Sequence, residues 1–426
     1  MNRAGAAVGA RVRRVAWFFG LAVMLAVSLV YVMNAPFGLP VLGQAAGVVG
    51  LIFLVVSLLL MLRCPSLATF CGGLEAMYAL HRGFGLAAYG FILLHPLLLA
   101  RKGGWEILTL QGKDFDFRSG WTAALVLMVV LFCTFILKTR GYAIWRRIHL
   151  LSVIALVFMA WHVVAYQTEW SLAGKVFVDL LLAIGLLVPV LRYFLVDEGA
   201  LAQSFVVEQV RRPANGVIDV LLAPLFKPMA ITPGQFVFAR FDSGPNYAGC
   251  SHFHPFTASA IEPDGRLRLS IKSSGGCTQR MQHLEPGAGA KLQGPFGELF
   301  QNVRQDSQVW IAGGIGITPF LARARALAPD HVPVRLFYFF DRATTAPYVD
   351  ELRTLDARNP KLDCFPVETQ GSAEFLPSIF DALLPPWNDK HYVLCGPDGL
   401  VDFVAAYLAR NGVLPEAISR ERFEFR

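Results

Sequence analysis

Six apolar segments in the first half of the chain are each long enough to cross a lipid bilayer. A spanning helix needs about 20 mostly apolar residues, and none of these segments has the regular polar face of a soluble amphipathic helix. They cover residues 15–33, 41–62, 75–100, 120–138, 144–166 and 173–195. The sequence therefore predicts a six-helix transmembrane domain over residues 15–197, preceded by a short N-terminal segment at residues 1–14. That N-terminus could pass for a signal peptide, but its apolar run is long and lacks a clear cleavage site.

Positive charges indicate how this domain is oriented, because basic residues are enriched in cytoplasmic loops. One side of the predicted helices carries Arg11, Arg13, Arg14, Arg63, Lys138, Arg140, Arg146, Arg147 and Arg192. The loop 101–118 opposes this assignment with four basic residues, which three acidic ones offset in part. We expect both termini in the cytoplasm of a bacterial cell, with the helices in its inner membrane. The net charge of +7 is attributed to this topology, since no nucleic-acid-binding motif accompanies it.

The second half of the chain is predicted to be soluble and to contain two domains. Residues 200–303 hold short β-rich segments separated by turn residues, at 204–210, 216–222, 235–241 and 266–272, which favour a small antiparallel barrel or sandwich. Over residues 305–426 strands at 309–312, 334–340 and 392–395 are each followed by a predicted helix, from 319, at 348–358 and at 400–411. This alternation predicts a parallel sheet with a nucleotide at the carboxyl ends of its strands.

Four histidines lie inside the apolar segments in two matched pairs, His81 with His95 and His149 with His162. Polar groups inside a bilayer are costly and rarely idle, and imidazole is a common ligand of haem iron. The gaps of 14 and 13 residues place one histidine of each helix near each membrane face, roughly 20 Å apart at about 1.5 Å per residue. We expect His81 to face His149, and His95 to face His162, as the axial ligands of two haems. Core histidines bonded to neighbouring helices are the alternative, which the matched depths disfavour.

The 13-residue gap carries a geometric conflict. At about 100° per residue, 14 residues return to nearly the same helix face, whereas 13 leave an offset of roughly 140°. Either the two ligands leave the 144–166 helix from opposite flanks, or that helix is distorted. Arg82, Arg146 and Arg147 lie near the first pair, where they could neutralise haem propionates or simply set the topology.

Two motifs in the β-rich domain predict a flavin site. His254, Pro255, Phe256, Thr257 and Ser259 form one strand, whose Thr257 hydroxyl could bond to an isoalloxazine ring edge. In the second motif, Lys272, Gly275 and Thr278 surround a glycine turn before a helix expected from Thr278, where backbone N–H groups can approach a pyrophosphate. Taken alone, the first motif could be an ordinary edge strand, and the second could be a glycine-rich hairpin loop.

Two further motifs predict a nicotinamide nucleotide site. The turn after the 309–312 strand contains Gly313, Gly314, Gly316, Thr318 and Pro319, which suit a tight turn and a helix start. Cys395, Gly396 and Pro397 end a later strand, and the Cys395 thiol would lie where nicotinamide meets flavin. A structural turn and an inert buried cysteine are the alternatives.

The seven cysteines are scattered and form no CxxC motif. We therefore expect thiols, not a disulfide framework.

Together these motifs, in this order, resemble the ferric reductase and NADPH oxidase superfamily, most closely its prokaryotic single-chain NADPH oxidase-like members. The resemblance covers about residues 15–426. It implies a multi-domain membrane protein, in which a six-helix transmembrane haem bundle with two b-type haems precedes a ferredoxin-reductase-like module. This module is an antiparallel β-barrel that binds FAD and an α/β domain that binds NAD(P)H. It also implies an aromatic ring against the flavin, for which Phe423 is preferred to Phe425. Leu99 stands where some eukaryotic members have another histidine, and no EF-hand signature is present.

The resemblance implies electron transfer from cytosolic NAD(P)H through FAD and two haems to an acceptor across the membrane. Dioxygen, giving superoxide, is the expected acceptor, and a ferric chelate is the alternative. A non-enzymatic haem-binding membrane subunit is a further alternative. Asp341 and Arg342 follow the 334–340 strand, where an acidic residue suits NADH and an arginine suits NADPH; we expect NADPH, with NADH tolerated. Neither a nucleic acid nor an obligatory protein partner is expected.

Overall fold

The computed structural model describes residues 20, 39–103, 105–109, 114–137, 142–168, 170–301, 303, 307–342, 346–371 and 376–421. The chain divides near residue 198 into two compact units, each described here by itself. Apart from residue 20, the first predicted membrane helix at 15–33 lies outside the described residues.

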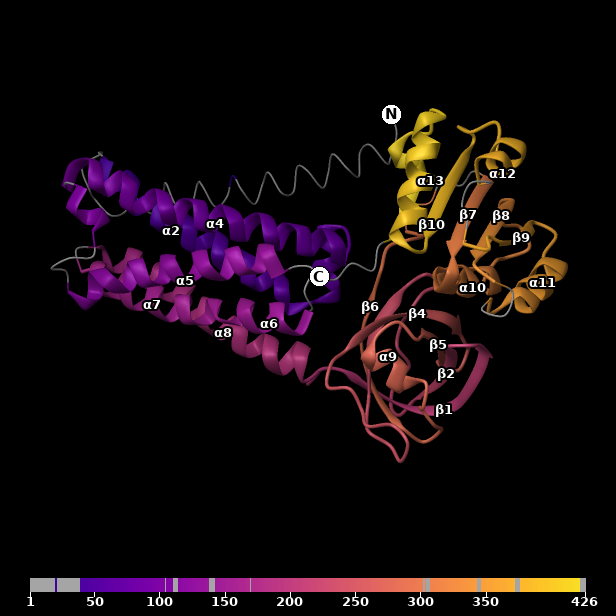
Figure 1. The fold of residues 1–426 in the computed structure, drawn as a ribbon. Helices are drawn as coiled ribbons and strands as arrows, with labels where there is room; N and C mark the ends of the chain where they lie inside the picture. The colour runs from indigo at the N-terminus through magenta and orange to yellow at the C-terminus, as the bar shows by residue number, and fades with distance from the viewer. Residues whose placement is uncertain are drawn as a thin grey trace. The chain divides into compact units, whose positions relative to one another are not determined.

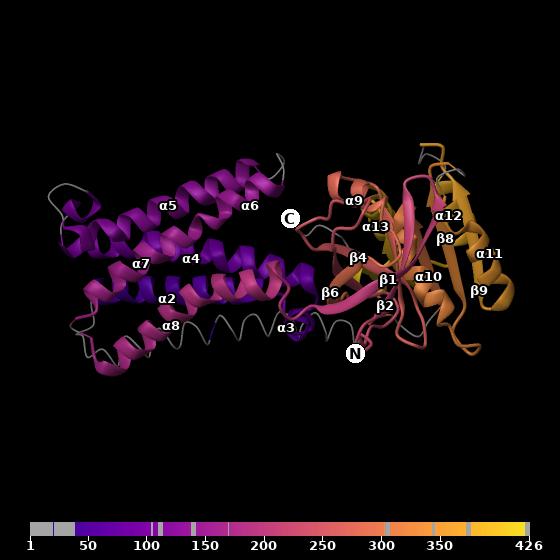
Figure 2. The same cartoon turned by 90° about the horizontal axis from the view of Figure 1, so that it is seen from below.

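The first unit is a bundle of apolar helices. Its helices are α2 (Leu39–Leu59), α3 (Pro65–Cys71), α4 (Leu74–Gly103), α5 (Phe115–Leu137), α6 (Tyr142–Leu150), α7 (Ser152–Tyr166) and α8 (Leu172–Arg192), with short turns η1 (Leu60–Leu62), η2 (Trp105–Leu108) and η3 (Tyr193–Asp197). In both views α2, α4, α5, α7 and α8 run alongside one another (Figures 1 and 2).

Five helical stretches among the described residues are long and apolar enough to span a membrane: Val41–Leu62, Leu74–Ala100, Phe115–Ile136, Ile144–Tyr166 and Leu172–Asp197. They correspond to the second to sixth predicted segments. Their outer surface is apolar, since Phe135 is 83% and Leu172 is 79% exposed, whereas Phe53 and Ala155 inside the bundle are fully buried. Apolar side chains so exposed are stable in lipid and costly in water, so the chain is an integral membrane protein.

The second unit begins with a closed antiparallel barrel. Its strands are β1 (Gln203–Ala214), β2 (Val217–Pro224), β3 (Phe236–Phe241), β4 (His254–Ile261), β5 (Leu267–Lys272) and β6 (Gly289–Phe296), in the order β1-β2-β5-β4-β3-β6. The sequence left barrel and sandwich open, and the pairing of β1 with β6 decides for the barrel. Helix α9 (Gly276–Met281) follows β5 and begins two residues before the predicted Thr278.

A five-stranded parallel sheet completes this unit, as predicted. Its strands are β7 (Ser307–Gly313), β8 (Val334–Phe340), β9 (Leu362–Glu368), β10 (Lys390–Cys395) and β11 (Ile418–Arg420), in the order β11-β10-β7-β8-β9. The connecting elements are η4 (Gly314–Ile317), α10 (Thr318–Arg325), α11 (Val349–Arg358), α12 (Leu376–Leu383), α13 (Asp398–Arg410) and η6 (Pro415–Ala417). Strand β9 was not predicted from the sequence, because this edge strand is only partly buried and contains Pro366.

Buried polar contacts join the barrel to the sheet domain. Arg268 of β5 donates two hydrogen bonds to the Glu351 carboxylate of α11, at 2.8 and 2.9 Å. Tyr348, just before α11, donates its hydroxyl to Asp219 of β2. Burial favours the neutral acid, but the bonds and charge of Arg268 outweigh it and lower the pKa of Glu351. These contacts fix the relative position of the two domains that carry the predicted nucleotide motifs.

Candidate functional site

The four membrane histidines meet in the two predicted pairs. The ring centres of His81 and His149 are 6.0 Å apart, and those of His95 and His162 are 6.3 Å apart. Both His81 and His95 lie on α4, while His149 lies in the last turn of α6 and His162 lies on α7. We call these the first pair (His81 and His149) and the second pair (His95 and His162).

The separation of the rings suits a shared metal ion. An imidazole nitrogen binds a transition metal at about 2 Å, and the ring centre lies roughly 1 Å further back, so two imidazoles on one metal have centres about 6 Å apart. Both pairs match this spacing. The residues present therefore fit a bis-imidazole metal centre such as haem iron at each of two depths.

Hydrogen bonds at Nδ1 orient three of the four rings. Nδ1 of His95 lies 2.8 Å from the Gly43 carbonyl oxygen, and Nδ1 of His162 lies 2.9 Å from that of Asp116. Nδ1 of His81 lies 2.9 Å from both the carbonyl and the hydroxyl oxygen of Ser57. An Nδ1–H donated to a carbonyl leaves Nε2 as the metal-binding atom and makes it a stronger ligand.

His149 differs from the other three histidines. Its Nδ1 is buried and has no hydrogen-bond partner among the described residues. Instead, the Trp145 ring stacks on the His149 ring with centres 5.3 Å apart and planes 10° apart. Aromatic packing therefore holds this ring where hydrogen bonds hold the others.

Two glycines that the sequence analysis missed allow the second pair to form. A Cβ at Gly120 would lie 2.8 Å from the His162 ring, and one at Gly47 would lie 3.1 Å from Nδ1 of His95. Each glycine stands four residues after the carbonyl that accepts the Nδ1 bond, at Asp116 and Gly43. A signal existed in the sequence, since both glycines interrupt apolar helices, but only the helix pairing reveals which ring each one faces.

The helix that carries the 13-residue gap is distorted within the gap. Leu151 separates α6 from α7, and the N–H groups of Leu151 and Ile154 bond to carbonyls three residues earlier, those of Ile148 and Leu151. A distorted helix is one of the two alternatives that the gap predicted. Nearby, Arg146 forms an ion pair with Asp197 at 2.9 Å.

The first predicted flavin motif forms strand β4. His254 and Pro255 are partly exposed, while Phe256 and Thr257 are largely buried. Ser259 is fully buried, and its hydroxyl contacts Ser270 at 2.7 Å and the Arg268 carbonyl at 3.1 Å. The Ser259 hydroxyl thus belongs to the network that joins the two soluble domains.

The second flavin motif forms the turn into α9. The Thr278 hydroxyl accepts hydrogen bonds from the N–H groups of Ser274 and Gly275, at 2.9 and 3.0 Å. A Cβ on Gly275 would meet no atom within 4 Å, so its surroundings are open to a ligand. Lys272 is exposed at the end of β5, and its Nζ would lie 3.9 Å from a Cβ at Gly314. The lysine of the barrel and the glycine turn of the sheet domain are therefore neighbours.

The two nicotinamide motifs pack directly against each other. Strands β7 and β10 pair in register from Ser307 with Lys390 to Ala312 with Cys395. A Cβ at Gly316 would lie 2.5 Å from the Cys395 carbonyl oxygen, and one at Gly313 would lie 2.8 Å from Pro397. A Cβ at Gly396 would in turn lie 2.9 Å from the backbone nitrogen of Gly313. Only glycines permit this approach, which brings Cys395 to the edge of the glycine turn.

The remaining motif residues follow from the strands and helices. Thr318 and Pro319 begin α10 and are buried. Asp341 and Arg342 follow β8 directly and are exposed, at the carboxyl edge of the sheet. Phe423 and Phe425 lie outside the described residues.

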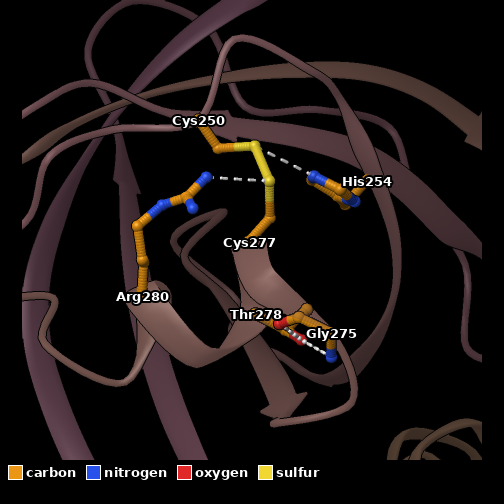
Figure 3. Close-up of a disulfide and its surroundings, with 6 residues drawn as sticks. All are labelled: Cys250, His254, Gly275, Cys277, Thr278 and Arg280. Carbon is orange, nitrogen blue, oxygen red and sulfur yellow. Dashed lines mark hydrogen bonds between the residues drawn. A yellow bond between two sulfur atoms is a disulfide. The ribbon is translucent and has the colours of Figure 1, made fainter. Parts of the chain in front are cut away.

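One expectation about the cysteines is wrong. Cys250 and Cys277 form a disulfide, so the chain is not a set of thiols alone (Figure 3). The two residues are 27 apart in sequence and lie outside any cysteine motif. The closed barrel brings them together, which spacing alone could not predict.

Residues 46–177 match the family model of the ferric reductase like transmembrane component. This range contains all four histidines of the two pairs. The match supports the predicted place of the chain in the ferric reductase and NADPH oxidase superfamily.

Curated relatives include two proteins of Pseudomonas putida. The oxidoreductase NdmD is 29% identical over 37% of this chain and 26% of its own length. A flavohemoprotein is 28% identical over 49% of this chain and 56% of its own length. The chain thus spans about a quarter to about half of these relatives. Among solved structures, the flavohem-like FAD/NAD binding domain of a nitric oxide dioxygenase from Vibrio cholerae has a TM-score of 0.43 and 22% identity, over 51% of this chain and 97% of that domain.

Proposed function

We propose that this ferric-reductase-like membrane protein is an NAD(P)H oxidase-type flavocytochrome. It passes electrons from cytosolic NAD(P)H through FAD and two b-type haems to dioxygen on the far side of the membrane, producing superoxide. The observation that carries the proposal is the presence of two imidazole pairs, each spaced for one metal, about 14 residues apart along α4. At about 1.5 Å per residue the two centres lie roughly 20 Å apart, at two different depths of the membrane.

In this proposal each pair would hold one haem, and its two histidines would supply both protein ligands of the iron. Iron held in this way would have no open position, which favours outer-sphere electron transfer over oxygen binding at the metal. The Nδ1 bonds of His81, His95 and His162 fix the rings, so little rearrangement accompanies a change of iron charge.

The soluble unit supplies the nucleotide sites. We assign the FAD ring to the His254–Thr257 part of β4, its pyrophosphate to the turn at Lys272, Gly275 and Thr278, and NAD(P)H to the glycine turn at Gly313. FAD converts hydride chemistry into one-electron steps, which is a property of the cofactor. Cys395 would line the place where nicotinamide meets flavin, and Phe423 is assigned as the aromatic ring against the flavin.

The closeness of Lys272 to Gly314 supports these assignments. The two predicted sites share an edge, as hydride transfer requires, and the Arg268–Glu351 bonds hold the domains in that arrangement. The relatives named as an oxidoreductase and a flavohemoprotein support a flavin-dependent oxidoreductase.

A pair of acceptor assays tests the proposal. Purified chain with FAD and NADPH should reduce a dye in air in a dismutase-sensitive way. Under argon, release of Fe(II) from a ferric chelate measures the second candidate, ferric-chelate reduction, which the description of the matching family model favours. Superoxide formation supports the oxidase, and Fe(II) formation without superoxide supports the reductase. No NADPH consumption with either acceptor would contradict both candidates and favour a non-enzymatic haem-binding subunit.

Nucleotide preference is tested at Arg342, which we assign to the 2′-phosphate of NADPH. Arg342→Ala should raise the KM for NADPH and leave that for NADH nearly unchanged. An equal rise in both would contradict the assignment.

A further inference from the structure

The Cys250–Cys277 disulfide joins the two segments to which we assign FAD. Cys250 lies four residues before His254 of β4, and Cys277 lies two residues after Gly275 of the α9 turn (Figure 3). Their Cα atoms are 6.0 Å apart. The loop that the disulfide closes thus contains all of β4 and β5, the first flavin motif, and Lys272 and Gly275 of the second.

The disulfide lies where the two strands have separated. β4 pairs with β5 from Ile261 opposite Leu267 to Ala258 opposite Leu269. Beyond that point Thr257 of β4 pairs with β3, and Lys272 of β5 pairs with β2. The disulfide connects the two segments beyond the point where the strands diverge.

Two polar side chains flank the sulfur atoms. Nε2 of His254 lies 3.3 Å from Cys250 Sγ, and Arg280 donates an N–H to Cys277 Sγ at 3.3 Å (Figure 3). Burial, followed by the charges of His252 and Arg280, lowers the pKa of His254, so its imidazole is neutral and can accept a thiol proton. A nearby guanidinium favours a thiolate. This environment is typical of reactive cysteines.

Small molecules can reach the sulfur atoms. A surface cavity of about 640 Å³ is lined by both cysteines together with Arg240, His252 and Arg280. Cys277 is partly exposed, and Cys250 is 8% exposed. Cys277 is therefore the sulfur that an oxidant would meet first.

We propose that Cys250 and Cys277 form a reversible thiol–disulfide pair whose oxidation fastens the two flavin-binding segments together and slows the loss of FAD. The inference rests on the proposed function, which places FAD on these segments in the cytosol. Disulfides in that compartment are seldom permanent and are usually transient redox sensors. A covalent link that holds a site in its bound form reduces the ordering cost of binding.

Hydrogen peroxide is the oxidant we assign to this pair. The Cys277 thiolate attacks one peroxide oxygen, the O–O bond breaks, and hydroxide leaves and takes a proton to become water. Cys250, whose proton passes to His254, then attacks the Cys277 sulfenic sulfur and displaces the second oxygen as water. Two thiols lose two electrons, and one peroxide becomes two waters. A dithiol reductant reverses the reaction by thiol exchange.

The test uses the detergent-solubilised full chain loaded with FAD. One sample is treated with hydrogen peroxide and one with dithiothreitol, both reagents are removed, and alkylation with mass spectrometry counts the thiols at residues 250 and 277. Dilution then releases FAD, which free-flavin fluorescence follows. We expect release to be about three- to tenfold faster in the reduced sample.

Cys250→Ser and Cys277→Ser should release FAD at the fast rate after either treatment. Cys364→Ser is the matched control: Cys364 lies on β9, where burial, followed by the charges of Asp356 and Asp363, raises the pKa of its thiol to about 12. This variant should keep the full difference between the two treatments.

Four results would overturn the inference. Equal rates of FAD release in the oxidised and reduced samples, or a disulfide that dithiothreitol does not reduce, would mean that the cysteine pair does not control FAD release. One zinc ion per reduced chain would instead make Cys250, His254 and Cys277 a metal site, since their ligand atoms all lie within 4.8 Å of one another. Failure to bind FAD in either state would overturn the proposed function as well, whereas equal rates with normal NADPH turnover would overturn the switch alone.

Discussion

The two histidine pairs of the membrane unit have the same residues and nearly the same ring spacing, but different surroundings. In the second pair both rings bond through Nδ1 to a backbone carbonyl, at Gly43 and Asp116. In the first pair His81 bonds to Ser57, whereas Nδ1 of His149 has no hydrogen-bond partner among the described residues. The His149 ring stacks instead on the ring of Trp145. A repeated ligand pattern therefore does not imply two equal sites, because the atoms behind the ligands set their basicity.

The strongest test of this comparison removes one ligand from each pair. His149→Ala and His162→Ala should each abolish one haem and leave the other, so that the pyridine haemochrome absorbance per chain falls by half. The two variants should retain spectra that differ from one another. Loss of all haem, or of none, in either variant would show that the pairs are not separate sites.

The next test acts on the second pair alone. Gly120→Ala places a methyl group 2.8 Å from the His162 ring, and such overpacking costs about 1–3 kcal/mol. We expect most of the haem of the second pair to be lost on purification, while that of the first pair remains. Gly90→Ala on α4 is the control, since a Cβ there meets nothing within 4 Å. Normal haem content in the Gly120 variant would contradict the proposed close approach.

A smaller effect is expected in the midpoint potentials. A hydrogen bond to Nδ1–H makes an imidazole more basic and stabilises ferric iron, and His149 lacks such a bond. The first site should therefore have the higher potential, by about 40 mV, the one-electron equivalent of roughly 1 kcal/mol. Potentiometric titration, assigned with the single-haem variants, measures the order. The reverse order would mean that other charges near the sites dominate.

The smallest effect is expected at Ser57. Ser57→Ala removes the hydroxyl 2.9 Å from His81 Nδ1 but keeps the backbone carbonyl at the same distance. The midpoint potential of the first site should rise by less than about 40 mV, since the hydrogen bond from His81 Nδ1–H to the Ser57 carbonyl remains. The second site should not change, and a shift there of similar size would show that the substitution disturbs the whole bundle.

Much of the fold followed from patterns that act locally along the chain. Five of the six apolar segments coincide with long helices, and the strand–helix alternation after residue 305 forms the predicted parallel sheet. Apolar runs and glycine turns depend on neighbours in sequence, so they can be recognised there. The pairing of His81 with His149 also followed, because a helical rise fixes the depth of a side chain.

Other features depended on residues far apart in sequence. The roles of Gly47 and Gly120 appear only once α2 lies against α4 and α5 against α7. Likewise the edge strand β9 lacks a strong apolar pattern, and the closure of the barrel depends on β1 meeting β6.

The sequence by itself determined where the membrane helices lie, which histidines stand at matching depths, and where the glycine-rich turns occur. Only the tertiary structure decided which Nδ1 atoms have acceptors, where the 144–166 helix breaks, and that Cys250 lies within bonding distance of Cys277. The physical reason is range: hydrophobicity and helical rise act between neighbours, whereas hydrogen bonds, steric gaps and disulfides are set by which surfaces the folded chain brings together.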